Sequence, residues 1–209
     1  MTPLALMQTA PVIPVLAFDN VEQAIEQSKA LVAGGLPVLE ITLRTASAID
    51  CIKAVAAEVE GAIVGAGTVL NPNDLERVVE AGAQFAVSPG ATDTLWRAAE
   101  QSPVPLLAGV ASVSDIMRGM EFGHTEFKFF PAEINGGVAA IKAFGGPLKG
   151  VSFCPTGGVK PANLADYLAL DNVVCVGGTW LTPKDADPMQ IEFYASDAVK
   201  MARAAGWTG

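Results

Sequence analysis

One lysine stands alone in an aromatic stretch, E-F-K-F-F-P-A, which runs from Glu126 to Ala132. Strand side chains alternate between two faces, so Lys128 lies on one face of this stretch, opposite Phe127 and Phe129. Removing an ammonium group from water favours its neutral form, and a neutral amine is a nucleophile. Such an amine forms a Schiff base with a keto acid, and the iminium lets a carbon–carbon bond break through an enamine. The alternative is a lysine that extends to solvent, or one that pairs with Glu40 for structural reasons only.

A carboxylate and a guanidinium occupy one face of an earlier apolar stretch, V-L-E-I-T-L-R-T. Alternation places Glu40, Thr42 and Arg44 on the same face, where a buried carboxylate is costly unless it is paired. One interpretation is a buried Glu40–Arg44 ion pair, although such pairs stabilise a fold only weakly. In the other, Glu40 lies beside Lys128 and transfers the protons that imine chemistry requires. Arg44 then offers a two-pronged donor for a substrate carboxylate.

Three glycine-rich turns are candidate binding loops. Two of them, Thr156-Gly157-Gly158 and Gly177-Gly178-Thr179, follow late apolar stretches of the chain. Backbone N–H groups in such turns can hold a phosphate, with help from the N-terminus of a following helix. The third turn, G-A-G-T-V-L-N-P, offers the Thr68 hydroxyl to a substrate carboxylate. An ordinary turn followed by a capped helix explains this third sequence equally well.

The remaining polar candidates have simpler explanations. His124 is the only histidine, and we expect it in a loop or at the surface. Asp19 and Glu133 could lie at the rim of a site, but the sequence indicates no specific partner for either. No cluster of His, Asp, Glu or Cys has the spacing of metal ligands, so we predict no metal. The three cysteines form no C-x-x-C motif, and we expect buried free thiols.

Short β-rich stretches alternate with Ala-rich amphipathic stretches along the whole chain. The predicted strands are Val12–Ala17, Val38–Leu43, Ala62–Ala66, Phe85–Val87, Val104–Val110, Glu126–Phe129, Val151–Phe153 and Val173–Val176. The predicted helices are Val21–Ala33, Ala46–Val59, Pro72–Ala81, Asp93–Gln101, Val113–Glu121, Val138–Phe144, Pro161–Ala169 and Met189–Ala205.

This alternation predicts an α/β protein, a compact (β/α)8 TIM barrel that forms a single domain over residues 1–209. The alternative is a doubly wound open sheet, but no G-x-G-x-x-G follows the first strand. In a TIM barrel, active sites lie at the C-terminal ends of the strands. The two later glycine turns follow the seventh and eighth predicted strands, where this fold frequently binds phosphate.

Composition disfavours several classes of partner. The chain is 51% hydrophobic and has a net charge of −9, with 13 Lys and Arg against 22 Asp and Glu. Without a run of cations, binding to nucleic acid or to an anionic membrane surface is disfavoured, whereas a small anionic ligand is not. No apolar stretch approaches the roughly 18 residues of a membrane span, and the N-terminal stretch lacks the cations of a signal peptide. We therefore expect a cytoplasmic protein.

Six stretches together resemble the 2-keto-3-deoxy-6-phosphogluconate (KDPG) / 4-hydroxy-2-oxoglutarate (KHG) aldolase family, Schiff-base enzymes built on a TIM barrel. They occur in the family's order, over about residues 10 to 205. The stretches are L-E-I-T-L-R-T (39–45), G-A-G-T-V-L-N-P (65–72), G-A-Q-F-A-V-S-P-G (82–90), E-F-K-F-F-P-A-E (126–133), F-C-P-T-G-G-V (153–159) and V-G-G-T-W-L (176–181).

The resemblance implies a role for each matching residue. Lys128 would be the Schiff-base lysine, and Glu40 would be the acid/base that transfers protons. The carboxylate and the pyruvate unit of the substrate would contact Arg44, Thr68, Pro89 and Phe130. The distal hydroxyls and the phosphate would contact Thr156, Gly157, Gly158, Gly177, Gly178 and Thr179.

By the same resemblance, the reaction would be reversible cleavage of KDPG to pyruvate and glyceraldehyde 3-phosphate. A side activity would cleave 4-hydroxy-2-oxoglutarate to pyruvate and glyoxylate. The family uses no metal or organic cofactor, and its members form homotrimers. The alternatives are the galactonate-derived relative of this aldolase, another phosphate-binding TIM-barrel isomerase or synthase, and a barrel that binds a sugar phosphate without catalysis. Two departures from the family pattern are A-G-V-A-S at 108–112 and Thr179, where serine is common.

Overall fold

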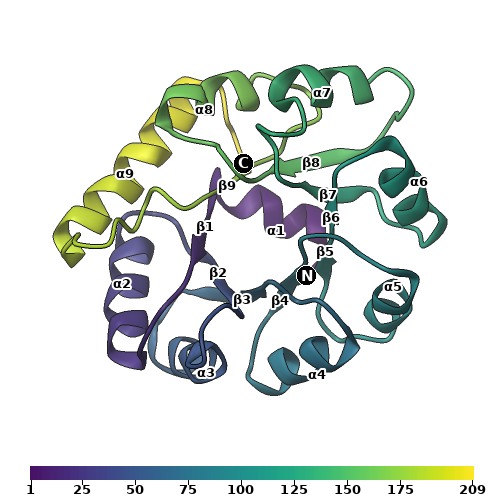
Figure 1. The fold of residues 1–209 in the computed structure, drawn as a ribbon. Coiled ribbons are helices and arrows are strands. Elements are labelled where there is room, and N and C mark those ends of the chain that lie inside the picture. The colour runs from purple at the N-terminus through teal and green to yellow at the C-terminus, as the bar shows by residue number, and fades with distance from the viewer.

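Parallel strands curl around a central axis, and helices pack against their outer side (Figure 1). The computed structural model describes residues 1–209. Its strands are β1 (Val12–Leu16), β2 (Val38–Thr42), β3 (Ile63–Gly67), β4 (Phe85–Val87), β5 (Leu106–Leu107), β6 (Gly109–Val110), β7 (Glu126–Phe129), β8 (Ser152–Pro155) and β9 (Val176–Gly178). Strands β1 to β4 and β7 are buried along most or all of their length, as expected where both faces of a parallel sheet are covered.

The helices alternate with the strands in the chain. They are α1 (Pro3–Thr9), α2 (Val21–Ala33), α3 (Ala48–Glu58), α4 (Pro72–Glu80), α5 (Asp93–Glu100), α6 (Val113–Glu121), α7 (Gly137–Phe144), α8 (Pro161–Leu168) and α9 (Pro188–Ala204). Several begin at the capping signals of the sequence. Asn71 accepts a hydrogen bond from the Asp74 N–H, and Pro72 follows it at the first helical position.

The strands form two parallel sheets that continue into each other. One has the order β5-β4-β3-β2-β1-β9 and the other the order β6-β7-β8. Ala108 alone separates β5 from β6, which were predicted as one strand over Val104–Val110. Single bridges, Phe153 to Val173 and Thr156 to Gly177, connect β8 to the β9 segment. The result is a curled parallel sheet with helices outside it (Figure 1), which agrees with the predicted α/β class.

The last predicted strand is wrong in position. We expected Val173–Val176, whereas β9 is Val176–Gly178 and pairs with β1 from Val12 to Pro14. Two glycines have weak intrinsic strand preference, but here they allow close packing of backbone against side chains. A Cβ at Gly177 would lie 2.9 Å from Thr156 Cγ2 and would overlap the Thr156 hydroxyl.

Helix α1 was not among the predicted elements. Thr2 caps it through a hydrogen bond from the Ala5 N–H, and Pro3 is its first residue. The helix precedes β1 in the chain, so it lies at the N-terminal ends of the parallel strands, across the middle of the ring in Figure 1. Leu6 and Met7 are completely buried there.

One cluster of 53 buried residues forms the hydrophobic core. Phe127 and Phe129 belong to it, and Phe129 packs edge-on against Phe144 and Phe153. Both rings therefore pack with the helices, as strand alternation predicted, and Lys128 between them points into the curled sheet.

Candidate active site

Lys128 and Glu40 meet inside the curled sheet, although 88 residues separate them in the chain. Lys128 Nζ donates to Glu40 Oε1 at 3.0 Å and lies 3.4 Å from Oε2. The two residues are only 5% and 3% exposed. The ring of Phe130 lies 5.3 Å from Lys128 Nζ, measured to its centroid. A charged amine and a carboxylate buried at this distance can exchange a proton directly.

Register explains how two distant residues come together. Glu40 in β2 pairs with Val15 of β1 and Gly65 of β3, and Lys128 in β7 pairs with Gly109 and Cys154. Paired residues of parallel strands point to the same side, so both side chains enter the interior from facing strands. The structure therefore confirms the prediction that the Glu40 and Lys128 side chains lie next to each other.

The alternative interpretation, a buried Glu40–Arg44 ion pair, is wrong, because Glu40 pairs with Lys128 instead. Arg44 is exposed, and its Nε lies 3.4 Å from the Thr68 hydroxyl, to which it donates. Strand β2 ends at Thr42, so Arg44 lies beyond the regular strand, although its side chain lines the same cavity as Lys128. The break moves the guanidinium to the mouth of the site, next to Thr68.

Gly67 makes room for Glu40. A Cβ at position 67 would lie 2.7 Å from Glu40 Cγ and would overlap the carboxylate oxygen that accepts from Lys128. The next residue, Thr68, has a positive φ of 61°, the only non-glycine residue in that conformation. Such backbone is costly for a β-branched residue and concentrates at functional sites.

We therefore expect Gly67→Ala to displace the Glu40 carboxylate and to lower kcat by about 100-fold, because a misplacement of about 1 Å has effects of that order. Steady-state kinetics with the substrate proposed below measures the change. Gly90→Ala is the matched control, since nothing lies within 4 Å of a Cβ there. An unchanged kcat in Gly67→Ala would show that the position of Glu40 does not matter.

A cavity of about 280 Å³ opens above this pair at the C-terminal ends of the strands. Its cationic side chains are Arg44 and Lys128. The full lining is Val15, Arg44, Thr68, Pro89, Lys128, Phe130, Thr156, Gly157, Gly158, Val159, Gly177, Gly178 and Thr179. The cavity is thus lined by every predicted site residue except Glu40, which contacts Lys128 without lining the cavity. Val15 and Val159 were not predicted, because an apolar side chain gives no chemical signal in the sequence.

Both glycine turns line the cavity together with Arg44. Gly157 and Gly158 have φ values of 98° and 83°, which glycine adopts without strain. No lysine or arginine of these turns lines the cavity, so an anion there would rely on backbone N–H groups and on the hydroxyls of Thr156 and Thr179.

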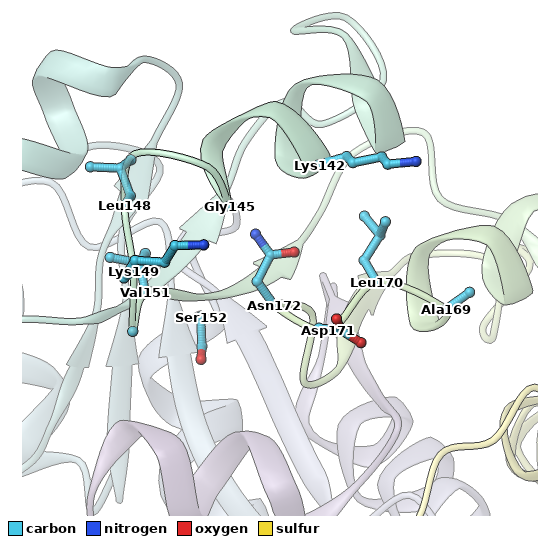
Figure 2. Close-up of a pocket in the computed structure, with 11 residues that line it drawn as sticks. Lys142, Gly145, Leu148, Lys149, Val151, Ser152, Ala169, Leu170, Asp171 and Asn172 are labelled. Atoms are coloured by element: carbon cyan, nitrogen blue, oxygen red, sulfur yellow. The ribbon is translucent and has the colours of Figure 1, made fainter.

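A second hollow lies at the opposite end of the strands and contains none of the predicted site residues. Its volume is about 560 Å³. Figure 2 shows Lys142 and Lys149 beside it, with Asp171 and Asn172 in the turn after α8. Lys142 belongs to α7, and the other three residues belong to turns that lead from helices into strands, whereas chemistry in barrels of parallel strands occurs at the other strand ends.

The other singled-out residues lie outside the cavity. His124 packs its ring 4.4 Å from Trp96, measured between centroids, and burial lowers the pKa of this imidazole. Cys51, Cys154 and Cys175 are free and buried, as predicted. Burial also raises the pKa of the Cys51 and Cys175 thiols, which keeps them protonated and inert. No helix is sufficiently long and apolar to cross a bilayer.

Comparison with known proteins gives consistent results. The family profile described as "KDPG and KHG aldolase" matches residues 4–193. The KHG/KDPG aldolase of Escherichia coli K12 is 54% identical over 203 residues, which cover 95% of each chain. The KDPG aldolase of Zymomonas mobilis ZM4, solved with 3-phosphoglycerate, has a TM-score of 0.93 and 45% identity, covering 97% of each chain.

A further solved structure is the KDPG aldolase of Legionella pneumophila with pyruvate captured as a covalent carbinolamine. It has a TM-score of 0.93 and 42% identity, and the match covers 95% of this chain and 98% of that one. A profile match over most of the chain, together with relatives of this identity and coverage, establishes the family. The chain belongs to the KDPG and KHG aldolase family.

Proposed function

We propose that this protein is a Schiff-base aldolase that cleaves KDPG to pyruvate and glyceraldehyde 3-phosphate. A side activity would cleave 4-hydroxy-2-oxoglutarate to pyruvate and glyoxylate. The observation that carries the proposal is the buried contact of 3.0 Å between Lys128 Nζ and Glu40 Oε1 beneath a cavity that also holds Arg44. The names of the relatives and the carbinolamine captured in the Legionella enzyme support it.

Imine formation begins with transfer of a proton from the Lys128 ammonium to Glu40, the carboxylate in contact with it. The neutral amine attacks the C2 carbonyl of the keto acid, and the carbonyl oxygen takes up a proton to give a carbinolamine. Protonation of that hydroxyl releases water and leaves an iminium. Arg44 and Thr68, at the mouth of the cavity, would hold the C1 carboxylate.

Cleavage requires removal of a proton from the C4 hydroxyl, which we assign to Glu40. The C3–C4 bond then breaks, its electron pair forms the C2–C3 enamine and neutralises the iminium, and C4 leaves as the aldehyde. Protonation of C3 gives the pyruvate iminium. Water adds to C2, and departure of the amine releases pyruvate and regenerates Lys128. Pro89 and Phe130 would pack against the pyruvate unit.

The phosphate would lie against the two glycine turns, at the hydroxyls of Thr156 and Thr179 and at the backbone of Gly157, Gly158, Gly177 and Gly178. The 3-phosphoglycerate in the Zymomonas enzyme supports a phosphate ligand of this family.

We further propose that β5 and β6 count as one strand, so that the curled sheet closes into an eight-stranded (β/α)8 barrel over residues 1–209. The bridges between β8 and the β9 segment support closure. We also propose a cytoplasmic homotrimer. Exposed apolar side chains such as Leu70, Met117 and Ile134, which are 56%, 55% and 84% exposed, support contacts between copies.

Borohydride reduction in the presence of pyruvate tests the proposed function. We expect a mass increment of pyruvate minus one oxygen atom on Lys128, located by peptide mass spectrometry, because reduction fixes the imine irreversibly. The same protein should release pyruvate from KDPG faster than from its galactonate-derived epimer. Absence of both a trapped adduct and pyruvate release from KDPG would favour a phosphate-binding barrel enzyme of another class.

A further inference from the structure

Glu133 has a partner that the sequence did not indicate. It follows β7 by a few residues, and its carboxylate Oε1 accepts a hydrogen bond from the hydroxyl of Tyr167. Tyr167 belongs to α8 and is completely buried. Burial, together with the hydrogen bond and the charge of Glu133, raises the pKa of Tyr167 well above its usual value. The phenol therefore keeps its proton and acts as the donor.

Glu133 lies directly behind one glycine turn of the cavity. Its backbone N–H donates to the Gly157 carbonyl at 3.1 Å, and the Ala132 N–H donates to the Thr156 carbonyl at 2.8 Å. A Cβ at Gly158 would lie 2.7 Å from Glu133 Cβ and would overlap its Cγ. Glu133 does not line the cavity, whereas Thr156, Gly157 and Gly158 do.

A second segment holds the same turn from its other side. Asn163 of α8 donates from its side-chain nitrogen to the Gly158 carbonyl at 3.3 Å, and its Oδ1 accepts from the Lys160 N–H at 2.7 Å. Helix α8 therefore supports the turn in two ways. Asn163 contacts it directly, and Tyr167, one helical turn further along, bonds Glu133 behind it. Because glycine turns are intrinsically permissive, contacts of this kind determine which way their N–H groups point.

From these contacts we infer that Tyr167 and Glu133 are a positioning pair, which fixes the Thr156–Gly158 turn in the shape that receives the phosphate of the substrate. The inference rests on the proposed function for the identity of the phosphate ester. A free carboxylate next to the turn would repel the phosphate dianion of the substrate. The hydrogen bond from Tyr167 instead holds the Glu133 carboxylate against a donor. Neither residue lines the cavity.

Tyr167→Phe removes the donor and nearly preserves the shape of the side chain. We expect it to raise KM for KDPG and Kd for 3-phosphoglycerate by about tenfold, since a lost hydrogen bond to a charged group has effects of that order. KM for 4-hydroxy-2-oxoglutarate, which has no phosphate, should stay within about twofold of the original value, because the Lys128 end of the site is untouched. Tyr194→Phe, on α9, is the matched control and should change neither substrate.

Glu133→Ala and the double variant complete the test. If Tyr167 acts through Glu133, the double variant should weaken 3-phosphoglycerate binding no more than either single variant. Equal losses for both substrates in Tyr167→Phe would show that the tyrosine serves folding alone and would overturn the inference. Calorimetric binding of 3-phosphoglycerate needs no turnover. It therefore tests the positioning pair even if cleavage of KDPG, and with it the proposed function, fails.

Discussion

Replacing Lys128 by methionine is expected to lower kcat for KDPG cleavage by on the order of 10⁵-fold or more, as when the nucleophile of a covalent mechanism is removed. Methionine fills a similar volume but has no amine to form the imine. The coupled release of pyruvate measures the loss, and borohydride trapping should give no adduct. Lys142→Met, which alters a lysine of the second hollow in Figure 2, is the control and should leave kcat unchanged. Turnover that survives in Lys128→Met would overturn the proposed mechanism.

Lys128→Met also leaves the buried Glu40 carboxylate without its partner. Glu40 is 3% exposed, and without Lys128 its carboxylate has no cationic partner. Breaking a buried ion pair in this way costs about 3–5 kcal/mol, so thermal unfolding should shift to lower temperature. Adding Glu40→Gln should recover much of that stability while the protein stays inactive. The double variant thus separates loss of chemistry from loss of fold.

Glu40→Gln alone is expected to lower kcat by about 10²–10⁴-fold, the usual contribution of a positioned acid/base. The amide oxygen still accepts a hydrogen bond from Lys128, so the fold should survive, but the amide cannot take up or return a proton. Pyruvate should still be trapped on Lys128 by borohydride, only more slowly. Rapid trapping with slow cleavage would assign Glu40 to proton transfer after imine formation.

Glu58→Gln, at the exposed end of α3, controls for the loss of one negative charge and should behave as the unaltered protein. If Glu40→Gln matched it, proton transfer would have to run through another group. In that case the 3.0 Å contact between Glu40 and Lys128 would be an ion pair of structural value only.

The pairing of Glu40 with Lys128 could be predicted because strand alternation and parallel register fix where side chains point. The same rule placed Arg44 in the cavity, but it did not identify the partner, because Arg44 lies two residues beyond the end of β2 and its Nε contacts the Thr68 hydroxyl. Alternation predicts the direction of a side chain only within a strand, and the neighbouring strands determine where that strand ends.

The glycine turns were predicted as binding loops, yet their immediate surroundings were not. Tyr167 and Glu133 are 34 residues apart, and neither residue type at that spacing indicates the other. The shift of the last strand to Val176–Gly178 has a similar origin. The position of this strand depends on its pairing with β1 and on the space that Thr156 needs. Both are tertiary contacts, which the strand preference of the local sequence does not predict.

Helix α1 covers the N-terminal ends of the strands (Figure 1). Leu6 and Met7 are buried at the N-terminal ends of the strands, whereas the cavity that contains Lys128 opens at their C-terminal ends. The departing aldehyde and the water that later hydrolyses the imine would both pass through this C-terminal opening. Because the pyruvate unit stays bonded to Lys128 until water hydrolyses the imine, the aldehyde leaves through this opening before pyruvate does.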